Sequence, residues 1–108
     1  MLTPGNIPQT LSVLLIALSL SHYAVAADKS TEELKHLVKH DCGSCHGMTL
    51  KGGLGPALQT KSLKQKPDEL LFITIKEGRP GTPMPPWKNL LSDNDIHSIV
   101  KILRNGLN

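Results

Sequence analysis

The stretch that decides the fold is Cys42-Gly43-Ser44-Cys45-His46, which contains the only two cysteines of the chain. Two thiols three residues apart, followed directly by an imidazole, form the attachment pattern of a covalently bound c-type haem. The spacing follows from the chemistry, because each thiol forms a thioether with one porphyrin vinyl group and the histidine ligates the iron. The motif therefore predicts one haem c held by Cys42 and Cys45, with His46 as the proximal iron ligand.

Three other interpretations start from the same cysteine pair. A disulfide between Cys42 and Cys45 is typical of small exported proteins, but a bridge across so short a loop stabilises little. A redox CxxC motif follows a strand in a thioredoxin-like βαβ unit, and the sequence has no such pattern. A structural zinc site takes four ligands, and no second cysteine pair or closely spaced Cys/His pair follows. Haem attachment is the favoured interpretation.

The amino-terminal part of this 108-residue chain has the features of a signal peptide. Residues 11–20 form an apolar run that is short for a membrane span, which needs ~20 apolar residues. Ala24-Val25-Ala26 has the small-residue pattern of a signal peptidase site, so we expect residues 1–26 to be removed and residues 27–108 to form one domain. No Lys or Arg occurs in the first ten residues, and an uncleaved anchor stays an alternative.

Export and composition agree with the haem interpretation. Haem c is generally attached outside the cytoplasm, so we expect a periplasmic protein. The expected domain has only Phe72 and Trp87 as aromatics, and so small a core usually needs a staple, which a covalent haem supplies. The net charge of +3 would be largely offset by two haem carboxylates. We therefore expect a monomer that binds neither nucleic acid nor, after cleavage, a membrane.

Apolar periodicity and capping residues predict an all-α domain of three main helices. Ser30 and Glu33 have the form of a capping box, and Ser92 is a second N-cap followed by acidic residues. Glycines at 78 and 106 are expected helix ends. Glycines and prolines predict loops at residues 51–56 and 79–86, the first of which lets the backbone approach a flat, bulky group. The helices are expected over about residues 31–40, between Pro67 and Gly78, and between Ser92 and Gly106.

The sixth iron ligand has to come from the opposite face of the porphyrin. Met48 lies two residues beyond His46 and is tied to the wrong face. Met84 lies within Pro83-Met84-Pro85-Pro86, where fixed φ angles keep the chain extended and stiff. Methionine in a core is usually a flexible gap filler, so a stiff loop favours a ligand. We predict Met84 as the distal ligand, with water or a displaced loop as alternatives.

Three further histidines follow the expected signal segment. His36 and His40 are spaced i, i+4 and share a helix face, which can bind a metal. Without further ligands, a solvated surface is the favoured interpretation of this pair. His97 follows Ile96 in the last expected helix, where we expect a partly exposed packing role.

These pieces together resemble the small class I c-type cytochromes over nearly all of residues 27–108. Residues 41–58 and 78–87 are most similar to cytochrome c55X, whose genes accompany cytochrome cd1 nitrite reductase in denitrifying bacteria. The resemblance implies a cytochrome c domain in which three helices wrap around one haem. It also implies that the Pro56 carbonyl accepts a hydrogen bond from Nδ1–H of His46 and that Trp87 packs near the haem. His46 and Met84 are expected to face each other across a slot lined by Pro56, Leu58, Leu71, Ile75 and Trp87.

A six-coordinate His/Met iron has no open position for substrate, so we expect single-electron transfer and no enzymatic activity. The resemblance implies either electron delivery to cytochrome cd1 nitrite reductase or a role with haem d1 biosynthesis and insertion proteins. The alternative is a haem-based protein that binds a ligand or a haem precursor after displacement of Met84. Five lysines are candidates for a partner-docking ring or a solvated surface, namely Lys51, Lys61, Lys64, Lys66 and Lys88.

Overall fold

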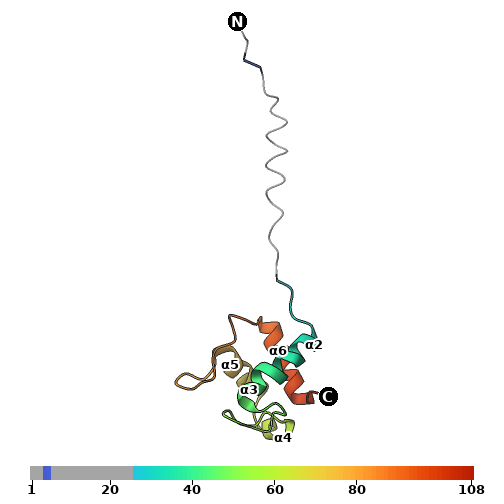
Figure 1. Cartoon of the computed structure of the whole chain (residues 1–108), viewed down its shortest axis with the longest axis vertical. Helices are drawn as coiled ribbons and strands as arrows, with labels where there is room; N and C mark the ends of the chain where they lie inside the picture. Colours follow the sequence, from blue (N-terminus) through green and yellow to red (C-terminus); the bar gives the residue numbers. More distant parts are fainter. Residues whose placement is uncertain (1–3, 6–25) are drawn as a thin grey trace.

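The computed structural model describes residues 4–5 and 26–108, and these residues contain helices and no strand. The all-α fold expected from the sequence is confirmed. The expected signal peptide, residues 1–26, lies outside the described residues apart from positions 4, 5 and 26. No helix in the described part of the chain is long and apolar enough to cross a membrane. The elements are α2 (Thr31–Leu37), η2 (Val38–Cys42), α3 (Gly43–His46), α4 (Thr60–Leu63), α5 (Asp68–Glu77) and α6 (Asp93–Asn105) (Figure 1).

The first helical segment, formed by α2, η2 and α3, runs without a break to His46. Its start is the expected capping box, in which the Ser30 hydroxyl accepts from Glu33 N–H and the Glu33 carboxylate accepts from Ser30 N–H. The expected end near residue 40 is wrong. The middle element is a π-helix, in which Gly43 N–H donates to the Val38 carbonyl five residues back. The wider turn breaks the 3.6-residue apolar period, so the pattern stops before the helix does.

The later helices lie close to their expected positions. Pro67 is the N-cap of α5, one residue before the helix, and α5 ends at Gly78 with φ +67°. The Ser92 hydroxyl caps α6 by accepting from Asp95 N–H, and α6 ends at Gly106. The short helix α4 was not expected, because its four residues carry no side-chain cap to reveal it.

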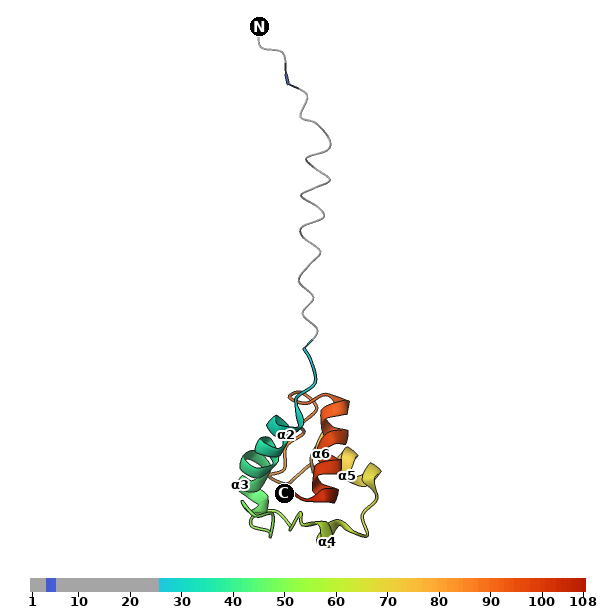
Figure 2. The same ribbon diagram turned by 90° about the vertical axis from the view of Figure 1, so that its right-hand side faces the viewer.

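The helices enclose one apolar core. The first helical segment lies on one side, α5 and α6 lie on the other, and the α4 segment connects the two sides beneath them (Figure 2). Helix α6 contacts α2, α4 and α5. The Asp95 carboxylate, 3% exposed, also accepts from Lys29 N–H at 2.8 Å, which ties the start of the described domain to α6. The buried apolar residues are Leu34, Val38, Leu50, Leu63, Leu71, Phe72, Leu91, Ile96, Ile99, Val100, Ile102 and Leu103.

Candidate functional site

The imidazole of His46 is 9% exposed and held in one orientation. Its Nδ1 lies 2.7 Å from the carbonyl oxygen of Pro56. Because a carbonyl oxygen can only accept, Nδ1 must carry the proton and donate. In the neutral ring this leaves Nε2 without a proton, as a metal ligand requires.

The glycine-rich loop after α3 packs directly on the His46 ring. Gly55 N–H donates to the Cys45 carbonyl and Gly52 N–H donates to the His46 carbonyl, both at 2.8 Å. A Cβ atom on Gly55 would lie 2.7 Å from His46 Cε1, and one on Gly53 would lie 2.8 Å from the Cys45 carbonyl oxygen. The loop was expected to approach a flat group, and the His46 imidazole is one such group. A side chain at position 53 or 55 would collide with the Cys45 carbonyl or with this ring.

Cys42 and Cys45 are both free thiols in the described chain and both line the same cleft as His46. They lie one helical turn apart, Cys42 at the end of η2 and Cys45 within α3. Burial, with a smaller effect of the Asp41 carboxylate, raises the pKa of the Cys42 thiol to about 11. This thiol is therefore protonated at neutral pH, which slows uncontrolled oxidation because the thiolate is the reactive form.

Met84 is held on a loop that folds back over the end of α5. Arg79 N–H donates to the Met84 carbonyl at 3.2 Å, and Met84 N–H donates to the Thr82 hydroxyl at 3.3 Å. At the far end of the loop, Trp87 N–H donates to the Ile75 carbonyl at 3.1 Å. A Cβ atom on Gly78 would lie 2.5 Å from the Pro85 carbonyl carbon, so the close return needs glycine. Hydrogen bonds at both ends add to the stiffness expected from the prolines.

One cleft of about 650 Å³ brings the predicted residues together. Cys42, Cys45 and His46 line it from the first helical segment, and Met84 lines it from the proline-rich loop. The five residues expected along the slot all line it as well, namely Pro56, Leu58, Leu71, Ile75 and Trp87. Its volume lies within the ~300–1,000 Å³ typical of cofactor and ligand sites.

The other methionine and histidine of interest lie outside this cleft. Met48 is 48% exposed, and its sulfur packs near Gly43. His97 is exposed and its ring stacks on Phe72, with centroids 4.3 Å apart, which is the packing role expected for it. Of the five candidate docking lysines, Lys66 lines the cleft and Lys88 forms an ion pair with Glu77 at 2.7 Å.

Arg104 braces one wall of the cleft and was not identified from the sequence. Its guanidinium donates to the Leu63 carbonyl at 2.6 Å, to the Lys66 carbonyl, and to the Asp68 carboxylate at 2.7 Å. It thereby holds the end of α4 and the chain that leads to α5, which carry the cleft residues Leu63 and Lys66. From the sequence, Arg104 is recognisable only as a basic residue in the last turn of a helix. Such a position by itself indicates a favourable interaction with the helix dipole and no contact with a distant segment.

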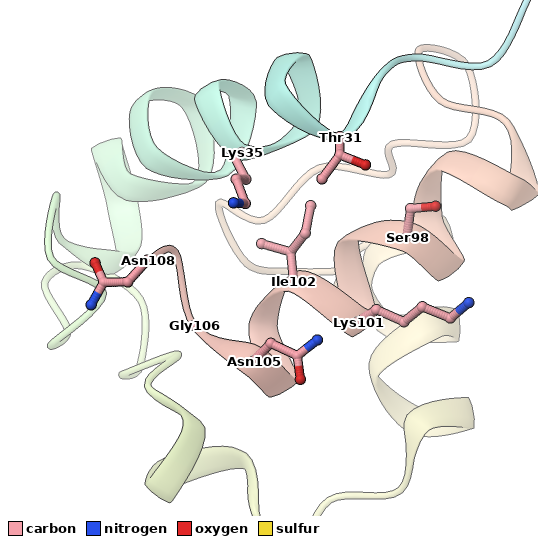
Figure 3. A pocket seen from close by; sticks show the side chains of 8 residues that line it. All are labelled: Thr31, Lys35, Ser98, Lys101, Ile102, Asn105, Gly106 and Asn108. Atoms are coloured by element: carbon pink, nitrogen blue, oxygen red, sulfur yellow. The ribbon is translucent and has the colours of Figure 1, made fainter.

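A second hollow of about 470 Å³ lies where α2 meets α6 and shares no residue with the cleft. The Lys35 side chain reaches from α2 toward α6 across the buried Ile102 (Figure 3). The lining of this second hollow carries amides, hydroxyls and ammonium groups but no thiol, thioether or imidazole. It therefore offers neither attachment thiols nor a methionine or histidine ligand for a haem.

Comparison with known proteins decides the family. Residues 29–102 match the family described as Cytochrome C oxidase, cbb3-type, subunit III. Cytochrome c55X of Pseudomonas aeruginosa is 54% identical over 68% of this chain, and the match spans 62% of that protein, somewhat less than two thirds. Cytochrome c55X of Stutzerimonas stutzeri is 46% identical over 88% of this chain and 82% of its own length. The chain belongs to the cytochrome c55X family.

Two solved structures support this placement of the cytochrome. The c-type cytochrome NirC is 53% identical, with a TM-score of 0.67 over 69% of this chain and 88% of that chain. Dihydro-heme d1 dehydrogenase NirN in complex with DHE is 31% identical, with a TM-score of 0.61 over 69% of this chain but 16% of that chain. The protein is thus a class I c-type cytochrome with an all-α fold and a covalently attached haem c.

The residues of the cleft fit this cofactor. Leu54 and Leu70 line the cleft although 76% and 47% of their surfaces are exposed, so apolar area faces the space that a flat apolar ring would fill. The same space is bounded by two free thiols, an imidazole and a thioether, which are the groups that attach haem c and ligate its iron.

Proposed function

We propose that this cytochrome is a periplasmic carrier of single electrons in denitrification and has no catalytic activity of its own. One observation carries the proposal: His46, with Nε2 free to ligate, and Met84 line one cleft together with both attachment cysteines. A protein that offers two axial ligands leaves no iron position open for substrate, which favours electron transfer over catalysis.

Each residue of the cleft has a separate role in this proposal. Haem bound here supplies one-electron chemistry at its iron. Cys42 and Cys45 would hold it covalently, and His46 and Met84 would ligate its iron. The Pro56 carbonyl keeps the proton on Nδ1 of His46, and Trp87 covers the neighbouring part of the cleft.

The cations of the cleft are suited to the acidic edge of a haem. Lys66 and Arg79 both line it, and neither forms an ion pair with an acidic side chain of the described residues. The one carboxylate in the lining is Asp41, next to the attachment motif. Lys66 and Arg79 are therefore the residues that would pair with the haem carboxylates and neutralise them.

The alternative function, binding of a small ligand or a haem precursor, requires Met84 to leave the iron. The hydrogen bonds from Arg79 to Met84 and from Trp87 to Ile75 hold the loop closed and favour the electron carrier. Met84→Ala should keep the attached haem, lose the long-wavelength sulfur-to-iron charge-transfer band, bind carbon monoxide and have a lower reduction potential. Met48→Ala, which changes an exposed methionine outside the cleft, is the matched control and should resemble the wild type.

Two outcomes of this experiment would contradict the ligand assignment. The first is a wild-type protein that lacks the charge-transfer band. The second is a Met84→Ala variant that keeps both the band and the potential. In either case another group occupies the sixth position, and the ligand-binding alternative gains support if wild type also binds carbon monoxide readily.

The second part of the proposal concerns the redox partner of this cytochrome. Membership of the cytochrome c55X family supports a role beside cytochrome cd1 nitrite reductase, and similarity to a domain of NirN supports a redox role in haem d1 biosynthesis. Deletion of the gene separates the two roles. Nitrite reductase that lacks haem d1 indicates the biosynthetic role, and nitrite reductase that contains haem d1 but is poorly reduced indicates electron delivery.

Processing and compartment are tested on the parent strain, which keeps the gene. The proposal expects the protein in the periplasmic fraction as a monomer, with an intact mass equal to residues 27–108 plus one haem. A mass that includes residues 1–26 would indicate a retained anchor, and a mass without haem but with a Cys42–Cys45 disulfide would remove the basis of the proposed function.

A further inference from the structure

Within residues 26–108, the exposed pair His36 and His40 is the one histidine cluster that the proposed electron transfer does not use. The two imidazoles lie on the first helical segment with ring centroids 4.2 Å apart and planes at 40°. Leu34 and Val38 of the same segment are buried, at 1% and 0% exposed, so the histidine pair faces solvent on another side of the helix. Neither ring has a hydrogen bond within the described chain, and their nitrogens are free to bind a ligand.

The two imidazoles lie close enough for one metal ion to bind both after a small rearrangement. Imidazole nitrogen binds Zn²⁺ at about 2.0–2.1 Å, which places the centres of two rings on one tetrahedral ion about 5 Å apart. The observed separation of 4.2 Å is about 1 Å shorter than this. Because both side chains are exposed, rotation about their torsions can separate the rings by this amount and aim one nitrogen of each ring at a common point. The i, i+4 spacing indicates a shared face, and the ring contact shows that the two side chains reach each other.

We propose that His36 and His40 form a surface site for a divalent transition-metal ion of the kind that imidazole prefers, Zn²⁺ or Cu²⁺. No group of three or more His, Cys, Asp and Glu side chains in the described residues is placed to hold a metal, so water completes the coordination. Glu32, one turn before His36, supplies a nearby negative charge, but its carboxylate also forms an ion pair with Lys35, with Oε1 3.7 Å from Nζ. Lys35 and Lys39 oppose a cation, and the site therefore binds an exchangeable ion.

The proposal is tested by isothermal titration of the haem-loaded protein, purified without a polyhistidine tag. Zn²⁺ is the probe, because it has no redox chemistry and cannot exchange electrons with the haem iron. The wild type should bind one Zn²⁺ per chain, and its melting temperature should rise with Zn²⁺ concentration. His36→Ala or His40→Ala should each weaken binding about 100-fold, since each leaves a single donor in place of two linked ones.

His97→Ala is the matched control, because it removes an exposed histidine that stacks on Phe72 and has no second imidazole beside it. It should keep wild-type Zn²⁺ affinity. An unchanged haem spectrum in each variant shows that the domain has folded. The proposal is wrong if the wild type binds no Zn²⁺ at millimolar concentration, or if either single variant binds Zn²⁺ as tightly as the wild type.

Discussion

Replacement of Gly55 by alanine tests how the glycine loop positions His46, the proposed proximal ligand. The new Cβ atom would lie 2.7 Å from His46 Cε1 and 2.8 Å from Nδ1, where ordinary contacts begin at 3.4 Å. The ring must therefore retreat by about 0.7 Å or the loop must open. Overpacking of this kind costs about 1–3 kcal/mol of folding free energy. For a domain of this size, each kcal/mol lowers the melting temperature by about 4–8 °C.

The same displacement should weaken the hydrogen bond from Nδ1 to the Pro56 carbonyl, now 2.7 Å long. In the proposed function that bond would make His46 a stronger donor to oxidised iron, so its loss should raise the reduction potential. A net hydrogen-bond energy of about 1 kcal/mol corresponds to about 40 mV for one electron. Thermal unfolding and potentiometric titration of the haem-loaded Gly55→Ala variant measure the two effects.

Gly106→Ala is the control, because it lies outside the cleft and its Cβ would meet nothing within 4 Å although its φ is +84°. It can lower the melting temperature through backbone strain but should leave the potential unchanged. If Gly55→Ala has the melting temperature and the potential of the wild type, the loop does not pack on the His46 ring as described, and the reasoning fails.

Three further predictions concern the rest of the domain. Arg104→Ala should destabilise the fold by about 1–3 kcal/mol in thermal or urea unfolding, because two carbonyls lose their donor, whereas Lys101→Ala on the same helix should be nearly neutral. The pKa of Asp28 lies below its ordinary value of 3.8 because Ser92 and Asn94 donate to it, so its stabilising effect is present above about pH 4 and is lost as pH falls further. Asp28→Asn should therefore flatten the fall in melting temperature below pH 4, and an unchanged profile would contradict this. Cys42→Ala with Cys45→Ala should give a poorly folded chain, since the core is small, and a cooperative unfolding transition like that of the haem-loaded protein would show that haem is not needed as a staple.

The parts of this domain that were predictable are those encoded by neighbouring residues. The capping box at Ser30 and the N-cap at Ser92 act within one turn, so local sequence was enough to place both helix starts. The attachment motif and the stiff setting of Met84 are local in the same sense. Both therefore pointed to residues that the fold brings to one cleft.

The features that the sequence did not reveal depend on distant partners or on an irregular turn. Arg104 contacts acceptors 36 to 41 residues away, and no local pattern records such a contact. The π-helix interrupts the apolar period that was used to find the helix end. The contact of Gly55 with His46 was hidden for a different reason. A glycine run indicates that something lies close but not what lies there.

The structure also explains why the attachment segment is built from a helix followed at once by glycines. The π turn carries Cys42 to the cleft, and the following turn of α3 adds Cys45 and His46, so one rigid segment supplies both attachment thiols and one imidazole. A rigid segment alone would leave the imidazole free to rotate about its side-chain torsions. The backbone of the glycine loop removes that freedom by packing against the ring and by fixing Nδ1 through Pro56. The orientation of the His46 imidazole is therefore fixed by its own segment and the glycine loop, independently of the loop that carries Met84, which suits the proposed electron carrier, whose iron ligands should move little between oxidation states.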